Sequence, residues 1–252
     1  MRVAALYDIH GNGEALEAVL GEVRALGVER VVVGGDVVPG PEPREVFASL
    51  TALDVPVEFI YGNGEVAVLE ELAGRAAKVP EQVRPMIRWS GENVGARERE
   101  LMRAWPKTVE MEIEGVGRVM FCHGTPRDEN EIFTKLATEE ELRGILESIA
   151  ADVVVCGHTH MQFDLKVGRV RVVNAGSVGM PFGAAGADWL LLGGGAGAAI
   201  GGVELRHTNY DLERAASRIR ATSFLGAADF AEKSVLHPPT EEAMLKAFTR
   251  KK

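Results

Sequence analysis

The stretch RVAALYDIHGNGEALEAVLGEVRALGVERVVVGGD, residues 2–36, contains two short apolar runs that each end on an aspartate. Between these runs, apolar side chains recur at the spacing of an amphipathic helix. The recurring positions are Leu16, Val19, Leu20, Val23 and Leu26. Gly27 is suited to end this helix, because glycine readily adopts the left-handed conformation of a helix C-terminus. The stretch therefore predicts a strand, a helix and a strand over residues 2–8, 11–27 and 30–36.

A second helix and a third strand continue the same alternation. Residues 42–53 have a helical pattern, and PVEFIYGN at residues 56–63 is typical of a strand that ends on Asn63. Strands and helices in this order form a buried parallel sheet with crossover helices. Open α/β sheets place their sites at the carboxyl ends of their strands. We therefore expect a site where these three strands end.

The second half of the chain is predicted to be richer in strands. Glycines separate paired apolar runs there, which is typical of β-hairpins. We expect hairpins at residues 108–124 and 163–176, a helix at about 138–150, a strand at 152–160, and a hairpin that joins residues 189–192 to residues 203–205. Residues 211–250 have mainly helical patterns. The sequence has no internal repeat and no second core, so we expect residues 1–252 to form one domain.

Residues 64–108 are predicted to be a helical insertion that carries many cations. Pro80 and Pro85 interrupt its helical pattern. Its basic residues are Arg75, Lys78, Arg84, Arg88, Arg97, Arg99, Arg103 and Lys107. The simpler interpretation places these cations on solvated helix faces. The alternative is that the insertion caps a site and directs some of the cations into it.

The composition excludes several classes of protein. A formal net charge of −9 argues against general nucleic-acid binding, although an acidic enzyme can bind a phosphate ester through cations held at its site. Cys122 and Cys156 each end an apolar run, so we expect them to be buried and unbridged. The sequence has no signal-peptide pattern and no apolar run of the ~18 residues that a membrane helix needs. We therefore expect a soluble, cytoplasmic protein.

Five short segments that follow predicted strands carry residues able to bind metal. They are Asp8-Ile9-His10, Gly35-Asp36, Gly62-Asn63, His123-Gly124 and Gly157-His158-Thr159-His160. Taken singly, each segment is more typical of a turn, or of a histidine in the core or on the surface, than of a metal site. Together they supply two carboxylates, one amide and four of the six histidines. This mixture suits Mn, Fe or Zn rather than Ca.

The number of candidate ligands indicates two divalent ions. The seven candidates are Asp8, His10, Asp36, Asn63, His123, His158 and His160. Seven ligands exceed what one ion would take here, but they suit a pair of ions ~3.5–4 Å apart. A carboxylate such as that of Asp36 can bridge such a pair because it offers two oxygens.

The series D-x-H, GD, GN, HG and GHTH resembles the calcineurin-like metallophosphoesterase superfamily, from Asp8 to about Ser177. The segments GDVVPGPEP, HGTPRD and NAGSVGMP and a closing YD further resemble a small bacterial and archaeal branch of phosphodiesterase-like members. The resemblance implies an α/β fold, a two-sheet αββα sandwich. We therefore expect residues 1–252 to be a single metallophosphoesterase domain, with a helical insertion at about 64–108 and a helical C-terminal segment at about 211–250.

The resemblance also implies a role for each ligand. The first ion would be held by Asp8, His10, Asp36 and His160, and the second by Asp36, Asn63, His123 and His158. A hydroxide that bridges the two ions would attack phosphorus in line, and no covalent phosphoenzyme is needed. Asp36, Asn63 and His123 would therefore also belong to the catalytic machinery.

Gly64 departs from the resemblance. Many family members have a histidine at this position, followed by Asp or Glu, and that histidine contacts the phosphate or protonates the leaving oxygen. Here Gly64 precedes Glu65, and the loss of a general acid typically removes ~10²–10⁴-fold of rate. The departure favours diesters or anhydrides with good leaving groups over alkyl monoesters. Gly-Asn-Gly is also good turn chemistry, so positive φ is one possible reason for the glycine.

The sequence leaves more than one function open for this chain. The chain is expected to be a phosphodiesterase or nucleotide pyrophosphohydrolase that acts on a small phosphate ester or nucleotide, or a phosphomonoesterase. A non-catalytic metal-binding scaffold is the other class, as in the small retromer subunit, but a scaffold should lose ligands. A protein Ser/Thr phosphatase is disfavoured, since GDVVPGPEP lacks the Asp-Arg-Gly usual in those members. Arg127 is either a phosphate clamp or a surface ion-pair residue. The oligomeric state is left open.

Overall fold

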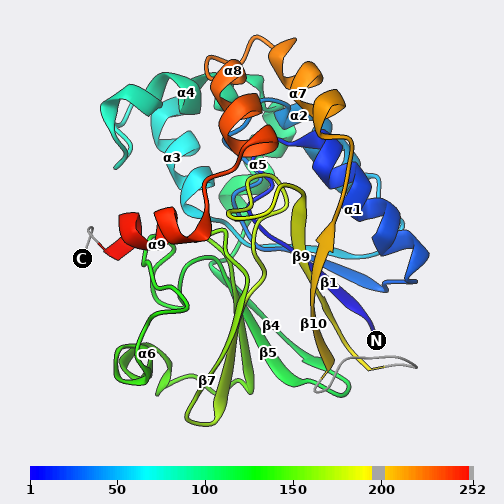
Figure 1. Cartoon of the computed structure of the whole chain (residues 1–252), viewed down its shortest axis with the longest axis vertical. Helices are drawn as coiled ribbons and strands as arrows, with labels where there is room; N and C mark the ends of the chain where they lie inside the picture. The colour runs from blue at the N-terminus through cyan, green and yellow to red at the C-terminus, as the bar shows by residue number, and fades with distance from the viewer. Residues whose placement is uncertain (195–201, 250–252) are drawn as a thin grey trace.

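Two five-stranded sheets pack face to face, and helices lie on the outer side of each (Figure 1). The computed structural model describes residues 1–194 and 202–249. Most of the turn expected between residues 192 and 203 lies outside the described residues. The two-sheet αββα sandwich expected from the resemblance is confirmed.

The first sheet has the strand order β10-β9-β1-β2-β3. Its strands are β1 (Val3–Leu6), β2 (Arg30–Val33), β3 (Val57–Phe59), β9 (Ala187–Leu192) and β10 (Val203–Thr208). β2 is parallel to both β1 and β3, as the βαβ alternation predicts. β9 and β10 form the expected antiparallel pair, and β9 adds to the free edge of β1.

The second sheet has the order β4-β5-β6-β8-β7. Its strands are β4 (Thr108–Ile113), β5 (Gly117–Cys122), β6 (Val153–Cys156), β7 (Phe163–Val167) and β8 (Val170–Asn174). The two predicted hairpins are confirmed, because β4–β5 and β7–β8 are antiparallel. The central strands β5, β6 and β8 run parallel, so this sheet also has a carboxyl edge at which loops meet.

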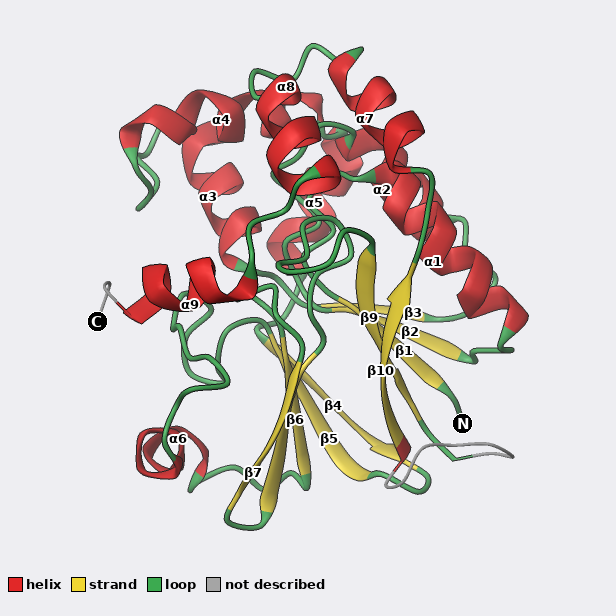
Figure 2. Ribbon diagram, in the orientation of Figure 1, coloured by secondary structure: helices red, strands yellow, loops and turns green. Residues whose placement is uncertain are grey.

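Most helices lie on the side of the first sheet that faces away from the second sheet (Figure 2). The helices of the first half are α1 (Gly13–Ala25), α2 (Pro43–Thr51), α3 (Asn63–Leu72), the 3₁₀ turn η1 (Glu81–Val83), α4 (Arg84–Asn93) and α5 (Ala96–Ala104). The later helices are α6 (Glu139–Leu146), α7 (Leu212–Arg220), α8 (Ala227–Phe230), the π-helical turn η3 (Ala231–Leu236) and α9 (Glu241–Thr249). The helical character predicted for residues 64–108 and 211–250 is confirmed in the described residues. None of the helices in these residues combines the length and apolarity needed to span a bilayer.

Strand β1 lies at the centre of the first sheet and is buried on both faces. Val3 and Ala5 pack between the two sheets, whereas Ala4 and Leu6 pack against the helices. The two pairs face opposite sides because successive side chains of a strand point to opposite faces of the sheet. Cys122 and Cys156 are buried and free, as predicted. The packing therefore fixes the strand ends, and the loops that leave them carry the predicted ligands.

Candidate metal centre

The loops that follow β1, β2, β5 and β6 meet at the carboxyl edges of the two sheets. The backbone N–H of Asp8 donates to the Gly35 carbonyl at 3.1 Å, and the N–H of His10 donates to the Asp36 carbonyl at 2.9 Å. The N–H of His158 donates to Asp8 Oδ2 at 2.9 Å. These bonds hold loops that are far apart in the sequence against one another.

Two groups of buried side chains have the arrangement of a metal site. Asp8, His10 and His160 form one group, and Asp8, Asp36 and His123 form the other, with the ligand atoms of each group all within 4.8 Å of one another. His160 Nε2 lies 3.3 Å from Asp8 Oδ1, and His123 Nε2 lies 3.5 Å from Asp36 Oδ1. His10 Nε2 lies 3.7 Å from Asp36 Oδ2. Each oxygen of Asp36 thus faces a histidine of a different group.

Asn63 and His158 lie beside the second group. Asn63 Oδ1 is 3.0 Å from His123 Nε2, and the rings of His123 and His158 have centroids 5.1 Å apart. All seven predicted ligands are therefore close to at least one other member of the set.

Two buried polar atoms of the cluster have no hydrogen-bond partner in the described part of the chain. They are Asp8 Oδ1 and His158 Nε2. A buried carboxylate oxygen and a buried ring nitrogen almost always have partners in native proteins. Both atoms are common metal ligands, and a bound cation would satisfy both.

Three of the imidazoles are held with one ring nitrogen against a backbone carbonyl. The Nδ1 pairs are His10 with Pro39 at 3.1 Å, His123 with Gly34 at 2.9 Å, and His160 with Met180 at 2.9 Å. A carbonyl can only accept, so each Nδ1 must donate its hydrogen. In the neutral ring this leaves a lone pair on Nε2, which is the atom that faces the cluster.

The ligand loops also carry unusual backbone conformations. The non-glycine residues with positive φ in residues 1–194 and 202–249 are Asp8 (53°), His10 (46°), Asp36 (52°), His158 (66°) and His160 (53°). Each such residue costs ~1–2 kcal/mol, and strain of this kind concentrates at functional sites. Five of the seven predicted ligands are therefore held in conformations that the surrounding structure must impose.

Burial and charge pairing shift the pKa values of the cluster in opposite directions. Burial alone would raise the pKa of Asp8, but His160 and then His123 hold this pKa well below its usual range. Burial would lower the pKa of His160 and His123, yet Asp8 and Asp36 outweigh it and raise both. Burial and then His123 lower the pKa of His158 to about 4. His158 is therefore neutral at pH 7, as a metal ligand must be.

Glu65 supports two of the ligand loops from a fully buried position. Its carboxylate accepts hydrogen bonds from the backbone N–H groups of Asp36 at 2.8 Å, Val38 at 3.2 Å and Gly62 at 2.8 Å. Burial, and then the charge of Asp36, raise the pKa of Glu65 to about 7. This role of Glu65 is not among the expectations drawn from the sequence. The pattern G-N-G-E contains the signal, since a Glu three residues after a helix N-cap commonly bonds back to it.

Gly64 lies in a helix and not in an isolated turn. α3 begins at Asn63, so Gly64 lies in its first turn, and its φ is outside the left-handed region. The expectation that positive φ explains this glycine is therefore wrong. Its N–H donates to the side-chain oxygen Asp36 Oδ1 at 2.6 Å, and its backbone packs closely against the Val38 carbonyl.

Arg127 lies in an exposed ion pair. Its guanidinium binds the carboxylate of Glu131 and reaches the Gly144 carbonyl. These contacts match the surface ion pair of the sequence analysis, and they leave the phosphate-clamp role as an expectation.

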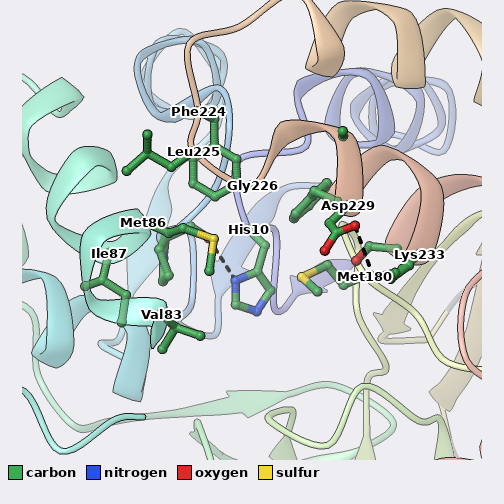
Figure 3. A pocket seen from close by; sticks show the side chains of 14 residues that line it. His10, Val83, Met86, Ile87, Met180, Phe224, Leu225, Gly226, Asp229 and Lys233 are labelled. Atoms are coloured by element: carbon green, nitrogen blue, oxygen red, sulfur yellow. Dashed lines mark hydrogen bonds and ion pairs between the residues drawn. The ribbon is translucent and has the colours of Figure 1, made fainter. Parts of the chain in front are cut away.

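The predicted cations of residues 64–108 also pair with glutamates. The pairs are Arg75 with Glu70, Arg84 and Arg88 with Glu71, and Arg103 with Glu100. The segment nevertheless borders the site, since Val83, Met86 and Ile87 line a cavity whose wall includes His10 (Figure 3). For these four arginines, the simpler interpretation of paired surface side chains fits better than a cationic cap.

The donor set, the unpartnered atoms and the held imidazoles all fit a site for divalent metal. In sequence comparison, a model described as the calcineurin-like phosphoesterase superfamily domain matches residues 1–192. The chain belongs to the calcineurin-like phosphoesterase superfamily. Membership of this superfamily supports a hydrolase role that uses divalent metal and acts on phosphate esters.

Two solved structures share the fold of this chain, and one further protein is similar to it in sequence. A hypothetical protein from Pyrococcus horikoshii has a TM-score of 0.77 at 20% identity, covering 91% of this chain and 97% of that one. A metallophosphoesterase from Sphaerobacter thermophilus has a TM-score of 0.69 at 22% identity, covering 93% and 99%. An uncharacterized protein of Methanocaldococcus jannaschii is 26% identical over 198 residues, which cover 71% of this chain and 76% of the relative.

Proposed function

We propose that the chain hydrolyses phosphodiesters or nucleotide phosphoanhydrides with two divalent ions at this cluster. The observation that carries the proposal is the pair of buried, unpartnered atoms, Asp8 Oδ1 and His158 Nε2. Both atoms belong to the cluster of carboxylate, imidazole and amide side chains described above. The two atoms support bound metal, because each costs free energy when it is left without a partner, and turnover then separates an enzyme from a metal-binding scaffold.

In this proposal the ligands divide between the two ions around Asp36. Asp8, His10 and His160 serve the first ion, and Asn63, His123 and His158 serve the second. Asp36 serves both, and its two oxygens face His10 and His123 respectively. The carbonyls that hold His10, His123 and His160 keep the Nε2 lone pairs directed at the ions.

Two divalent ions, of which Mn, Fe and Zn suit these ligands, would supply Lewis acidity toward the phosphate and lower the pKa of a bound water. The chain itself supplies rigidity. The strained ligand backbones and the buried Glu65 fix the ligands before substrate arrives, so the reaction has little reorganisation to drive.

The substrate class follows from Gly64. No side chain at this position can protonate a leaving oxygen, so substrates with good leaving groups are favoured. Phosphodiesters of acidic alcohols and phosphoanhydrides meet this condition, whereas alkyl monoesters do not.

The test is turnover of bis(4-nitrophenyl) phosphate by protein loaded with Mn, compared with an alkyl 4-nitrophenyl diester and with an alkyl monoester. The proposal predicts turnover of both nitrophenyl diesters and very slow turnover of the monoester. Protein that binds two ions per chain but hydrolyses none of these compounds would instead fit the scaffold alternative. Monoester turnover as fast as diester turnover would contradict the proposed substrate class.

A further inference from the structure

A cavity of about 590 Å³ lies beside the metal centre, and His10 belongs to its wall (Figure 3). One side of the cavity is Val83, Met86 and Ile87, from η1 and α4. Met180 also lines it, and the carbonyl of this residue accepts from His160 Nδ1. The cavity is therefore continuous with ligands of the first proposed ion.

The other side of the cavity comes from the C-terminal part of the chain. Residues 224–226, 228–230 and 233–234 line it, and they include Phe224 and Phe230. These residues follow the superfamily match, which ends at residue 192. This wall therefore lies outside the part of the chain that matches the superfamily model.

Ion pairs fix α7, which packs against the C-terminal wall, to the starts of α1 and α2. Arg214 binds Glu14 at 2.5 Å, and Arg218 binds Glu42 at 2.6 Å. Glu42 in turn accepts from the backbone N–H of Gly13 at 3.1 Å. α7 is thus bound to the start of α1, just after the ligand loop, and it also packs against Phe224 and Phe230. The wall therefore has a defined position relative to the ligands.

The chemistry of the cavity fits an aromatic group. Its lining contains two phenylalanines, and two methionines whose sulfur atoms make favourable contacts with aromatic rings. Asp229 and Lys233 are its oppositely charged lining residues, and they pair with each other at 3.0 Å. The volume lies within the range of about 300–1,000 Å³ that small-molecule pockets have.

We propose that this cavity binds an aromatic group of the phosphate ester whose phosphate lies at the metal centre. The position of the phosphate rests on the proposed function, whereas the cavity and its chemistry do not. The cavity makes the organic part of the substrate, and not only its phosphate, a determinant of specificity.

The first test measures binding without turnover. Metal-loaded protein is titrated by calorimetry with (1-naphthylmethyl)phosphonate and with methylphosphonate, whose carbon–phosphorus bonds are not hydrolysed. Burial of the aromatic ring should make the naphthyl compound bind roughly 10- to 100-fold more tightly. Equal affinities of the two compounds would overturn the proposal.

Two variants and a control test whether the preference for the naphthyl compound arises in the cavity. Ala228→Trp fills the cavity from an exposed position, and Met86→Gln replaces an apolar wall with an amide of similar size. Both should lower the naphthyl preference about tenfold or more and leave methylphosphonate binding unchanged. Ala48→Trp, at an exposed position of α2, should not change the preference. A preference that survives in both cavity variants would overturn the proposal.

A turnover assay separates this proposal from the proposed function. 1-Naphthyl 4-nitrophenyl phosphate and methyl 4-nitrophenyl phosphate share a leaving group and differ in the retained group. A lower KM for the naphthyl ester, lost in Ala228→Trp, supports the cavity. Turnover of both esters with no binding preference would overturn the cavity and keep the function. A binding preference without turnover would keep the cavity and overturn the function.

Discussion

The backbone of Gly64 lies directly against the Val38 carbonyl, so that a Cβ added to Gly64 would stand 2.2 Å from the Val38 oxygen. The same Cβ would stand 2.8 Å from Asp36 Oδ1, the atom that accepts the Gly64 N–H. Real Cβ atoms do not approach other atoms so closely. Gly64 therefore keeps the first turn of α3 against the loop that carries the proposed bridging ligand.

Because of this contact, we expect that Gly64→His does not simply restore the histidine that many family members have at this position. Any side chain at residue 64 would displace the loop at residues 36–38 or the start of α3, and Asn63 and Asp36 would move with them. Restoring a histidine at this position would therefore disturb the ligands that it is meant to assist. The catalytic question that Gly64 raises is better tested through the leaving group of the substrate.

Gly64→Ala should destabilise the protein and weaken metal binding. Overpacking of this kind typically costs ~1–3 kcal/mol. Gly21→Ala is the matched control, because Gly21 lies within α1 and a Cβ there meets no atom within 4 Å. Replacing glycine at such a helical site should stabilise by ~0.5–1 kcal/mol. Thermal melting and metal titration measure both effects, and equal behaviour of the two variants would contradict the steric account.

Glu65→Gln should weaken metal binding although Glu65 is not itself one of the proposed metal ligands. The amide group cannot accept at both of its polar atoms, so at least one of the N–H groups of Asp36, Val38 and Gly62 loses its partner. Loss of such support commonly lowers metal affinity roughly 10- to 100-fold. Competition against a chelator of known affinity measures this change. Affinity equal to that of the wild type would show that Glu65 does not position the ligands.

The clustering of the candidate ligands could be predicted from the sequence because it depends on local order. Strand periodicity located the ends of β1, β2, β5 and β6, and parallel strands bring their ends to one edge whatever the details of packing. Within each sheet, residues at those ends are therefore close by topology, as Asp8 and Asp36 are, whereas Asp8 and His123 meet because the two sheets pack face to face. The fold class followed from the same alternation and from the resemblance.

The rest of the site depends on contacts that leave no local pattern. The cavity brings Met86 of α4 against the segment that contains Phe224 and Phe230, and no periodicity links positions so far apart in the chain. Gly64 was assigned to a turn because Gly-Asn-Gly favours one, but the approach of Val38 decides its conformation. Tertiary contacts outweighed local propensity at both places.

Glu71 should make a pH-dependent contribution to stability. Its side chain is buried and binds Arg84 at 2.5 Å and Arg88 at 3.0 Å, which joins α3 to α4. Hydrogen bonds from Arg84, then from the Ala77 N–H and Arg88, lower the pKa of Glu71 from 4.5 to about 2. A lowered folded-state pKa stabilises the protein above the unfolded-state value, and this stability is lost as the pH falls from about 4.5 to about 2.

Glu71→Gln should therefore lower the melting temperature of the metal-free protein at pH 6, with a smaller difference at each step below pH 4.5. Glu70→Gln is the matched control, since Glu70 is next to Glu71 on α3 and pairs with Arg75 just beyond the helix, but both side chains of this pair are partly exposed. Exposed pairs contribute little. A pH-independent difference for Glu71→Gln, or an equal loss in the control, would contradict this role.

His158→Ala and His160→Ala should affect different ions. His160 lies with Asp8 and His10, and His158 lies beside His123. Each variant should retain one ion at limiting metal concentration, and the second ion should bind only at higher concentration. Metal titration followed by elemental analysis measures the two steps. Loss of both ions together in each variant would contradict the division of ligands.

The metal content of Asp36→Asn, measured together with its turnover of bis(4-nitrophenyl) phosphate, tests the central claim most directly. Asn can still accept the Gly64 N–H, but it presents an N–H₂ group in place of one oxygen and carries no charge. The account predicts two ions per chain in wild-type protein purified without chelators, and fewer than two in Asp36→Asn, with turnover reduced at least ~10³-fold. Two tightly bound ions and full turnover in Asp36→Asn, or wild-type turnover without any divalent ion, would contradict it.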